Sequence, residues 1–210
     1  MSGNTYKLYG RPNSGSLAPQ IVLEEIGAPY ELIWVGRAAA DIETLRQLNP
    51  AGKVPALVLL DGTPVFESAA ILIHLAHAYP AANLAPPPGT TGHARFLQWM
   101  SFMSSNVYES VLRIYYPERY SMSGAAAAAE IKQQAVADYV RHLEVIHDTL
   151  SPYVLGEKLS AADPYLYMLA AWYPGESAVL HARLPKLAQH AELLRQRAAT
   201  LKAERAHTDG

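Results

Sequence analysis

The stretch NPAGKVPAL, residues 49–57, leads from a predicted helix over residues 41–48 into a predicted strand over residues 56–60. Pro55 stands just before this strand, where a proline can adopt the cis form. A cis Pro55 leaves the backbone N–H and C=O of Val54 unpaired, so that Val54 can pair with an extended ligand as an added strand would. An ordinary strand entry with a trans proline is the other interpretation of the same residues.

Outward from this stretch, strand and helix patterns alternate. The predicted strands cover residues 6–9, 30–35, 56–60 and 64–66, and the predicted helices cover residues 17–26, residues 41–48 and a segment from Ser68 to just before Pro80. Asp61-Gly62 favours a tight hairpin, because both positions tolerate a positive φ. This order predicts a parallel strand pair with a helical crossover, followed by an antiparallel hairpin.

A proline-rich segment divides the chain. Residues 80–92 contain Ala-Pro-Pro-Pro-Gly, which can continue neither a helix nor a central strand, so we interpret them as a linker. Beyond it the sequence predicts only helices, over residues 93–115, 124–150, 160–173 and 185–205. We therefore predict an α/β domain over residues 1–79 and an all-α domain over residues 93–210.

The composition of the chain argues against several classes of partner and binding site. The net charge of −2 and the lack of a long basic run argue against nucleic acid or an anionic membrane as a partner. With no cysteine, the 210-residue chain has no disulfide, thiolate metal site or protein thiol nucleophile. His74 and His77 form a pair without a third ligand, so we predict no metal site. No apolar run approaches the ~20 residues that span a bilayer, and we expect a soluble cytoplasmic protein.

A second motif, Glu67-Ser68, stands where the third helix begins. A serine hydroxyl beside a free helix N-terminus is a ready site for an anion. Glu67 can accept a hydrogen bond from an ammonium group, so the pair suits the amine and carboxylate of an α-amino acid. Plain capping of the helix by Ser68 explains the same residues without a ligand.

A third motif, YGRPNSGS at residues 9–16, places the hydroxyls of Ser14 and Ser16 and the amide of Asn13 between a strand and a helix N-terminus. A thiol bound there would meet hydrogen-bond donors and the positive end of the helix dipole, and both favour the thiolate. A free thiol has a pKa of about 8.5 and needs a drop of about 1.5 units to be half ionised at neutral pH. We also expect Ser16 to cap the helix.

In their order and spacing, the three motifs resemble those of cytosolic glutathione transferases. Lys7-Leu8-Tyr9 with Ser14 is similar to the first strand and catalytic serine of the phi and theta types, while Ser16-Leu17-Ala18-Pro19 resembles the bacterial beta type. Asn13 falls where some bacterial members related to disulfide reductases carry an asparagine. The resemblance implies a thioredoxin-like α/β domain that binds glutathione, followed by an all-α domain, the glutathione transferase fold.

The resemblance implies that one of three groups meets the glutathione sulfur: the Ser14 hydroxyl first, with Ser16 and Asn13 as alternatives. Gly15 stands where beta-type members carry cysteine, so mixed-disulfide chemistry through a protein thiol is ruled out.

The other implied contacts hold the tripeptide. Val54, next to a cis Pro55, would pair with the cysteinyl backbone, and Lys53 would meet the glycyl carboxylate. Glu67 and Ser68 would hold the γ-glutamyl amine and carboxylate.

The predicted all-α domain has two further features of interest, a helix face and an aspartate. Ser101, Ser105, Tyr108, Leu112 and Tyr115 share one face of the helix over residues 93–115, a polar and aromatic mixture that suits a cleft wall or a dimer surface. We expect Tyr108 near the electrophile, with Trp172 either nearby or buried in the core.

Asp163 stands three residues after Ser160. This spacing predicts a capping box, a structural role rather than a catalytic one.

The resemblance therefore implies a homodimeric transferase that conjugates the glutathione thiolate, as co-substrate and without a metal, to small hydrophobic electrophiles in detoxification. A glutathione-dependent disulfide reductase or peroxidase is an alternative, because two glutathiones can supply the sulfur. A non-catalytic binding module with this fold is a third possibility.

Overall fold

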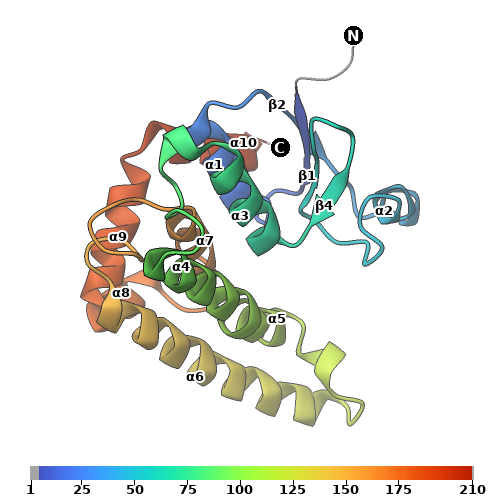
Figure 1. Cartoon of the computed structure of the whole chain (residues 1–210). Coiled ribbons are helices and arrows are strands. Elements are labelled where there is room, and N and C mark those ends of the chain that lie inside the picture. The colour runs from blue at the N-terminus through green and yellow to red at the C-terminus, as the bar shows by residue number, and fades with distance from the viewer. Residues whose placement is uncertain (1–4, 210) are drawn as a thin grey trace. The chain divides into compact units, whose positions relative to one another are not determined.

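The computed structural model describes residues 5–209, which form two compact units (Figure 1). The first unit combines the described residues up to Ala85 with those from Leu193 onward, and the second unit spans Pro86–Glu192. The division after Ala85 falls within residues 80–92, which we interpret as a linker. The predicted helical domain over residues 93–210 differs at its end, because the C-terminal helix belongs to the first unit. Residues 1–4 and 210 lie outside the described part of the chain.

The described residues form one mixed sheet with the strand order β2-β1-β3-β4. Its strands are β1 (Tyr6–Gly10), β2 (Tyr30–Trp34), β3 (Ala56–Val58) and β4 (Pro64–Phe66). β1 and β2 are parallel, while β3 is antiparallel to both of its neighbours. The predicted crossover and the predicted hairpin are both confirmed. In the hairpin turn the Asp61 carboxylate accepts a hydrogen bond from the Thr63 N–H at 2.9 Å.

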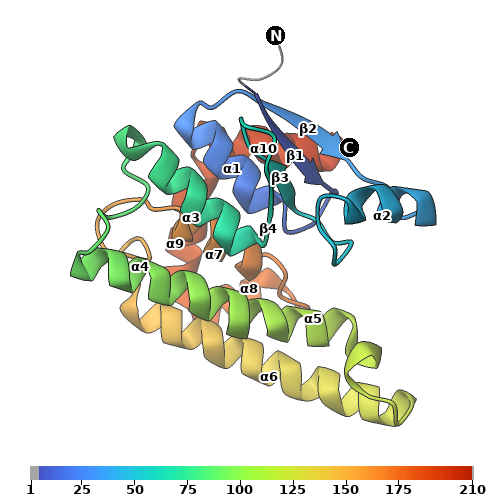
Figure 2. The same ribbon diagram turned by 45° about the vertical axis from the view of Figure 1, so that its right-hand side comes forward.

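Helices complete the first unit. They are α1 (Leu17–Ile26), α2 (Ala39–Arg46), α3 (Ser68–Ala78), the short 3₁₀ segment η1 (Pro80–Ala82) and α10 (Ala198–Asp209). α1 and α3 lie side by side (Figure 2). Apolar side chains from β1, α1, β3 and α3 meet in the core, where Leu8, Ile21, Leu57 and Ile71 are fully buried. Gly27 ends α1 in the left-handed conformation that favours glycine at this position, with φ 66°.

α10 is held against α1 by ion pairs. The Arg197 guanidinium donates to Glu25, with Nη2 2.7 Å from Oε2, and the Lys202 ammonium donates to Glu24 at 2.8 Å. His207 meets the Trp34 ring edge-on, with 5.0 Å between ring centroids. These contacts explain why the last helix belongs to the α/β unit, although it follows helices of the second unit in sequence.

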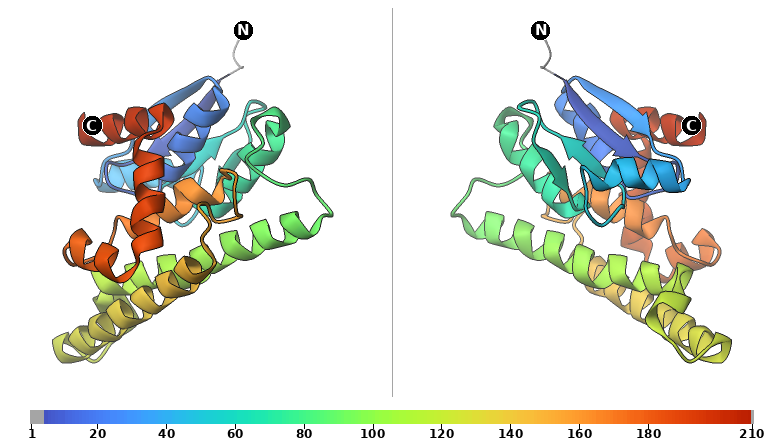
Figure 3. Two further views of the ribbon diagram at one scale, coloured as in Figure 1. Left: turned by 90° about the vertical axis from the view of Figure 1, so that its left-hand side faces the viewer. Right: turned by 90° about the vertical axis from the view of Figure 1, so that its right-hand side faces the viewer.

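The second unit is helical throughout its described regular elements. They are α4 (Thr91–Phe102), the π-helical segment η2 (Met103–Tyr108), α5 (Glu109–Tyr115), the 3₁₀ segment η3 (Pro117–Tyr120), α6 (Ala125–Thr149), α7 (Ala162–Ala170), α8 (Ser177–Arg183) and α9 (Pro185–Arg195). α4, η2 and α5 follow one another without a break, and α6 runs back beside them (Figure 3). This confirms the predicted helices over residues 93–115 and 124–150, apart from the π-helical segment.

Asp163 anchors α7, whose residues from Ala162 to Leu169 are all buried. Its carboxylate accepts hydrogen bonds from the Ser160 N–H at 2.7 Å and the Ser160 hydroxyl at 2.8 Å, which confirms the predicted capping box. The same carboxylate lies 2.8 Å from the Val154 N and 3.1 Å from His190 Nε2, so it also ties the preceding loop and α9 to α7.

Of two predicted helix caps, Ser16 is right in position but not in its hydrogen bond, and Ser68 is wrong. Ser16 occupies the N-cap position of α1, but its hydroxyl does not bond to the first turn of the helix. Ser68 is the first residue of α3, and Glu67 takes the N-cap position in its place. In both cases a backbone carbonyl of the loop before α1 competes for the hydroxyl. A half-buried carbonyl needs a donor, and the serines supply it.

Candidate functional site

The sheet register gathers the three motifs at one end of the sheet. Tyr9 lies opposite Ala56, and Ala56 lies opposite Phe66. At this end of the sheet, the loop over residues 11–16 follows β1 and Val54-Pro55 leads into β3. Glu67 follows the last residue of β4 at the same end. The segments that sequence analysis selected independently are therefore neighbours in the first unit.

A hydrogen bond joins two of these segments directly. The Ser68 hydroxyl donates to the Gly15 carbonyl at 3.3 Å, and the Ser68 residue is only 5% exposed. This bond fixes the first turn of α3 to the loop that precedes α1. Two helix N-termini thus lie close together, and each carries a partial positive charge. The arrangement favours an anionic ligand.

In the loop before α1, two hydroxyls cluster around the backbone N–H and C=O of Arg11. Ser14 Oγ donates to the Arg11 carbonyl at 2.7 Å and lies 2.9 Å from Ser16 Oγ. The Arg11 N–H lies 3.3 Å from both hydroxyl oxygens. Ser16 is fully buried, whereas Ser14 is half-buried. Asn13 is exposed with φ 52°, and its side-chain amide makes no hydrogen bond with any residue in the described part of the chain.

The Val54-Pro55 peptide bond is cis, as the position of Pro55 before β3 suggested. Pro55 is buried and Val54 is half-buried. Within residues 5–209, the backbone N–H and C=O of Val54 have no hydrogen-bond partner. The backbone of Val54 is therefore available for pairing with an extended ligand, which is the condition that the sequence predicted.

Sequence analysis missed the residue that shapes this loop. Asn49 is 3% exposed, and its side-chain amide donates to the Lys53 carbonyl at 2.7 Å while its Oδ1 accepts from the Ala51 N–H at 3.0 Å. The only available signal was an asparagine at a helix end, which we interpreted as a helix stop. Asparagine also makes such local turn bonds.

Glu67 and Lys53 present charged side chains at the edge of this site. Both are exposed. Glu67 has φ 74°, a conformation uncommon outside glycine, while its carbonyl accepts the first helical hydrogen bond of α3 from the Ile71 N–H at 3.0 Å. Non-glycine residues with such strain concentrate at functional sites.

Arg11 is the second residue that sequence analysis missed. Its guanidinium donates to the Val35 carbonyl at 3.0 Å and to the Gly36 carbonyl at 3.0 Å. Arg11 thus ties the end of β1 to the end of β2 while its peptide holds the two serines. A basic residue directly after a strand was the available signal.

Comparisons with known proteins show the family of the chain. The family described as "Glutathione S-transferase, N-terminal domain" matches residues 16–78. The uncharacterised GST-like protein YncG of Escherichia coli strain K12 is 32% identical over 175 residues, which cover 80% of this chain and 82% of YncG. The chain belongs to the glutathione transferase family.

Solved structures of glutathione transferases extend the likeness to nearly the whole chain. A homologue from Sulfitobacter with bound glutathione is 27% identical, with a TM-score of 0.86 over 97% of this chain and 98% of that one. A sphingomonad glutathione S-transferase complexed with glutathione is 31% identical, with a TM-score of 0.82 over 97% of this chain and 100% of that one. The predicted fold class, a thioredoxin-like α/β domain with an all-α domain, is confirmed.

Tyr108, the predicted electrophile contact, lies in the second unit of this transferase-family chain. It is the last residue of η2, and its ring meets Trp172 edge-on with 5.4 Å between centroids. The Tyr115 hydroxyl donates to the Trp172 carbonyl at 3.1 Å. Trp172 therefore lies beside Tyr108, one of the two expected positions, and it is half-buried rather than part of the core.

The π-helical segment η2 was not predicted. Serine hydroxyls bond to carbonyls four residues earlier at both of its ends, from Ser105 to Ser101 at 2.8 Å and from Ser110 to Asn106 at 2.8 Å. Such bonds compete with the regular helical pattern. π-helical turns occur frequently at functional sites, and η2 sets the position of Tyr108.

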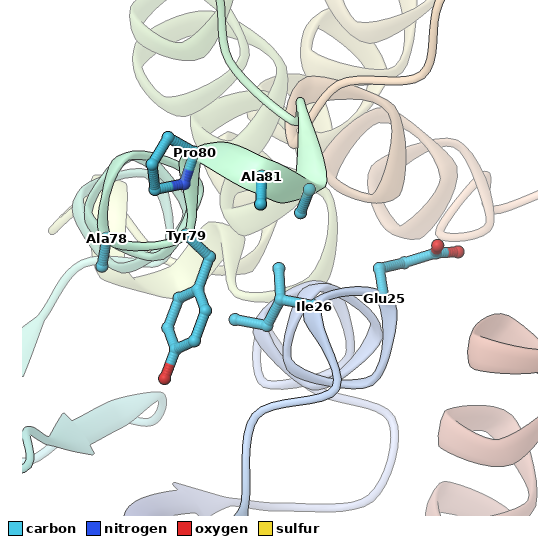
Figure 4. Close-up of a pocket in the computed structure, with 7 residues that line it drawn as sticks. Glu25, Ile26, Ala78, Tyr79, Pro80 and Ala81 are labelled. Atoms are coloured by element: carbon cyan, nitrogen blue, oxygen red, sulfur yellow. The ribbon is translucent and has the colours of Figure 1, made fainter.

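An open hollow of about 440 Å³ lies elsewhere in the first unit (Figure 4). Its lining residues are Glu25, Ile26, Ala78, Tyr79, Pro80, Ala81 and Ala82. They belong to the C-terminal ends of α1 and α3 and to η1, whereas Ser16 and Ser68 lie at the N-terminal ends of α1 and α3. None of the candidate residues lines this hollow.

Residues 5–209 contain neither a candidate membrane span nor a candidate metal site. None of the helices in this range is long and apolar enough to cross a membrane. The same range contains no group of three histidine, cysteine or acidic residues that could hold a metal ion.

Proposed function

We propose that this protein is an active glutathione transferase that joins the glutathione thiolate to small hydrophobic electrophiles. The hydrogen bond from Ser68 to Gly15 carries the proposal, because it brings the anion-binding end of α3 to the serine loop before α1. Glutathione carries a carboxylate at its γ-glutamyl end and a thiol on its middle residue. The carboxylate suits the N-terminus of α3, and the thiol suits the serine loop.

Each part of glutathione has a candidate partner. The γ-glutamyl carboxylate would take the N-terminus of α3 and Ser68, and the γ-glutamyl ammonium would take Glu67. The cysteinyl backbone would pair with Val54, whose N–H and C=O are open among the described residues. Lys53, which is exposed, would meet the glycyl carboxylate.

Ser14 would then donate a hydrogen bond to the sulfur. Its hydroxyl is half-buried beside the N-terminus of α1, whereas Ser16 has no exposed surface. A drop of about 1.5 units in the thiol pKa corresponds to about 2 kcal/mol. One hydrogen bond to a charged group contributes about 1.5–3 kcal/mol and a helix end about 0.3–1 kcal/mol, so these two effects are sufficient.

The proposed reaction needs no protein nucleophile or charged base. The thiol releases its proton to water, the thiolate attacks the electrophilic carbon, and with an aryl halide a C–S bond forms as halide leaves. Ser14 keeps its own proton throughout. Catalysis comes from stabilising the thiolate and from holding it near the electrophile. We propose that Tyr108 contacts the electrophile.

Retention on immobilised glutathione, followed by turnover of a panel of aryl halides, tests the proposal. We expect binding and turnover, with the turnover of a Ser14→Ala variant lower by about 10- to 30-fold near neutral pH because less thiolate is present. Thr149→Ala is the control, because the Thr149 hydroxyl of the second unit donates to a backbone carbonyl, that of Ile146 at 3.0 Å, and has no part in the proposed site. Failure to bind glutathione would contradict the proposal.

A glutathione-dependent disulfide reductase or peroxidase remains the second candidate. Asn13 favours it, since its side-chain amide is exposed in the same loop and unbonded within the described residues. Two glutathiones would supply both sulfurs, because the chain has no cysteine. Higher activity on a small mixed disulfide than on aryl halides, lost in Asn13→Ala, would favour this function. Glutathione binding without turnover of either substrate would instead indicate a binding module.

We further propose a cytoplasmic homodimer. Large apolar side chains are exposed in each unit, among them Phe66 on β4 at 39% and Leu97 on α4 at 36%. Sedimentation equilibrium should give twice the 22.9 kDa mass of the chain, and a monomer at micromolar concentration would contradict this proposal.

A further inference from the structure

We propose that Ser16, although too deeply buried to touch a ligand, controls whether Ser14 can donate its proton to the glutathione sulfur. The inference rests on the proposed function and gives Ser16 a positioning role rather than direct contact. It begins from the Arg11 peptide, which both hydroxyls share. The Arg11 carbonyl lies 2.7 Å from Ser14 Oγ and 3.3 Å from Ser16 Oγ.

Ser14 needs a second hydroxyl nearby, because it has one proton and two possible acceptors, the Arg11 carbonyl and the thiolate. A serine hydroxyl has one proton to donate. In the structure, Ser14 donates its proton to the Arg11 carbonyl. Turning that proton toward a thiolate would leave the half-buried carbonyl without its shortest hydrogen bond, and an unpaired carbonyl shielded from water is costly. Ser14 alone could therefore gain little from the new bond.

Ser16 is placed to take over this carbonyl. Its exposed fraction is 0%, so its proton can go only to a protein acceptor, either the Arg11 carbonyl at 3.3 Å or Ser14 Oγ at 2.9 Å. A proton from Ser16 to Arg11 frees the Ser14 proton for the ligand. A proton from Ser16 to Ser14 makes Ser14 a stronger donor, because hydrogen bonds in a chain polarise one another.

Backbone donors keep Ser14 in place while its proton turns. Ser14 Oγ lies 3.3 Å from the Arg11 N–H and 3.3 Å from the Ser16 N–H. Both contacts are long, and the Arg11 N–H is shared with Ser16 Oγ at 3.3 Å, so they hold the oxygen in place without preventing rotation of the hydroxyl about its Cβ–Oγ bond. When Ser16 donates to the Arg11 carbonyl, only the proton of Ser14 has to move on ligand binding.

Gly10 makes room for this arrangement. A Cβ on Gly10 would stand 2.4 Å from Ser16 Oγ and 2.7 Å from Ser16 Cβ, closer than real Cβ contacts. The Gly10 carbonyl is already occupied, because it accepts the Val35 N–H at 2.9 Å. Ser16 is therefore packed tightly against β1, and its hydroxyl has few orientations other than toward Arg11 and Ser14.

The test measures the pKa of the bound glutathione thiol in the full-length protein. The thiolate absorbs in the ultraviolet, and a difference spectrum against the S-methylglutathione complex isolates it across a pH series. We expect Ser16→Ala to raise the thiol pKa by about one unit, a tenfold loss of thiolate stabilisation. Ser14→Ala should raise it further, and the double variant should match Ser14→Ala, because Ser16 acts through Ser14.

Ser16→Cys provides a graded check in a side chain of similar size. A thiol is a weaker hydrogen-bond donor than a hydroxyl, so this variant should give a thiol pKa between those of the unsubstituted protein and Ser16→Ala. It also serves if Ser16→Ala fails to fold, which circular dichroism would reveal. Affinity for S-methylglutathione should stay unchanged in both variants. Thr149→Ala should titrate like the unsubstituted protein.

The outcomes separate this inference from the proposed function. An unshifted thiol pKa in Ser16→Ala or Ser16→Cys, with a raised one in Ser14→Ala, would overturn the inference and leave the function standing. Equal shifts from Ser16→Ala with and without Ser14 would also overturn it, since Ser16 would then act independently. No thiolate band in the unsubstituted protein would overturn the function and the inference together.

Discussion

Replacing Asp163 by alanine should destabilise the second unit more than any other single polar substitution that we propose. The Asp163 carboxylate is 0% exposed and accepts four hydrogen bonds, from the Val154 N–H, the Ser160 N–H, the Ser160 hydroxyl and His190 Nε2. Asp163→Ala removes the acceptor and leaves the donors buried.

The magnitude follows from those donors. An unsatisfied buried donor costs about 1–3 kcal/mol. The Ser160 hydroxyl can turn to another acceptor, which leaves three donors, and water entering the vacated space would recover part of the loss. We therefore expect a loss of about 4 kcal/mol in the free energy of unfolding, which is at the upper end for single substitutions. For a chain of this size the melting temperature should fall by roughly 8–16 °C.

Denaturant unfolding and thermal melts followed by circular dichroism would measure this loss. Asp148→Asn is the matched control, because the Asp148 side chain is 79% exposed and its removal should change stability by about 0.5 kcal/mol or less. A loss below about 1 kcal/mol for Asp163→Ala would refute the reasoning, since it would mean that the four hydrogen bonds do not hold α7 in place.

Three further predictions concern the first unit. Burial lowers the pKa of His207 to about 4, below its ordinary value of 6.5. Between these two pH values the unfolded chain binds more protons than the folded one, so the free energy of unfolding should fall by about 2 kcal/mol from pH 7 to pH 5. The same loss should be absent in His207→Phe. Arg197→Ala should speed amide hydrogen exchange in α10 and lower the free energy of unfolding by about 1–2 kcal/mol, because its partner Glu25 is only 11% exposed. Lys202→Ala should lower it by less than about 0.5 kcal/mol, because the Lys202 side chain is 70% exposed. Gly10→Ala should displace Ser16, cost about 1–3 kcal/mol by overpacking and raise the bound thiol pKa; unchanged melting and titration curves would contradict this.

Local signals made most of the first unit predictable. Gly27 ends α1, Asp61-Gly62 forms the hairpin turn, and Pro55 before β3 indicated the position of the cis bond. Each of these features depends on residues within a few positions of one another, so the sequence pattern contains the information. The gathering of the three motifs at one sheet end follows from the element order once the strand register is known.

The parts that could not be predicted depend on partners distant in sequence or on the backbone. Ser16 was expected to accept a hydrogen bond from the first turn of α1, but its hydroxyl bonds to the backbone N–H and C=O of Arg11, and nothing in a list of residue types distinguishes these partners. The return of α10 to the first unit depends on Arg197 meeting Glu25, which is 172 residues away. The position of Tyr108 depends on the π-helical segment η2, which the apolar periodicity does not reveal.

The pH titration of the glutathione thiol in its complex with this protein tests the central claim most directly. The account predicts that the bound thiol ionises about 1.5 units below the ordinary value of about 8.5, and that Ser14→Ala returns most of this shift while glutathione still binds. Identical titration curves for the unsubstituted protein and Ser14→Ala would contradict the account, because they would show that the Ser14 hydroxyl does not stabilise the thiolate.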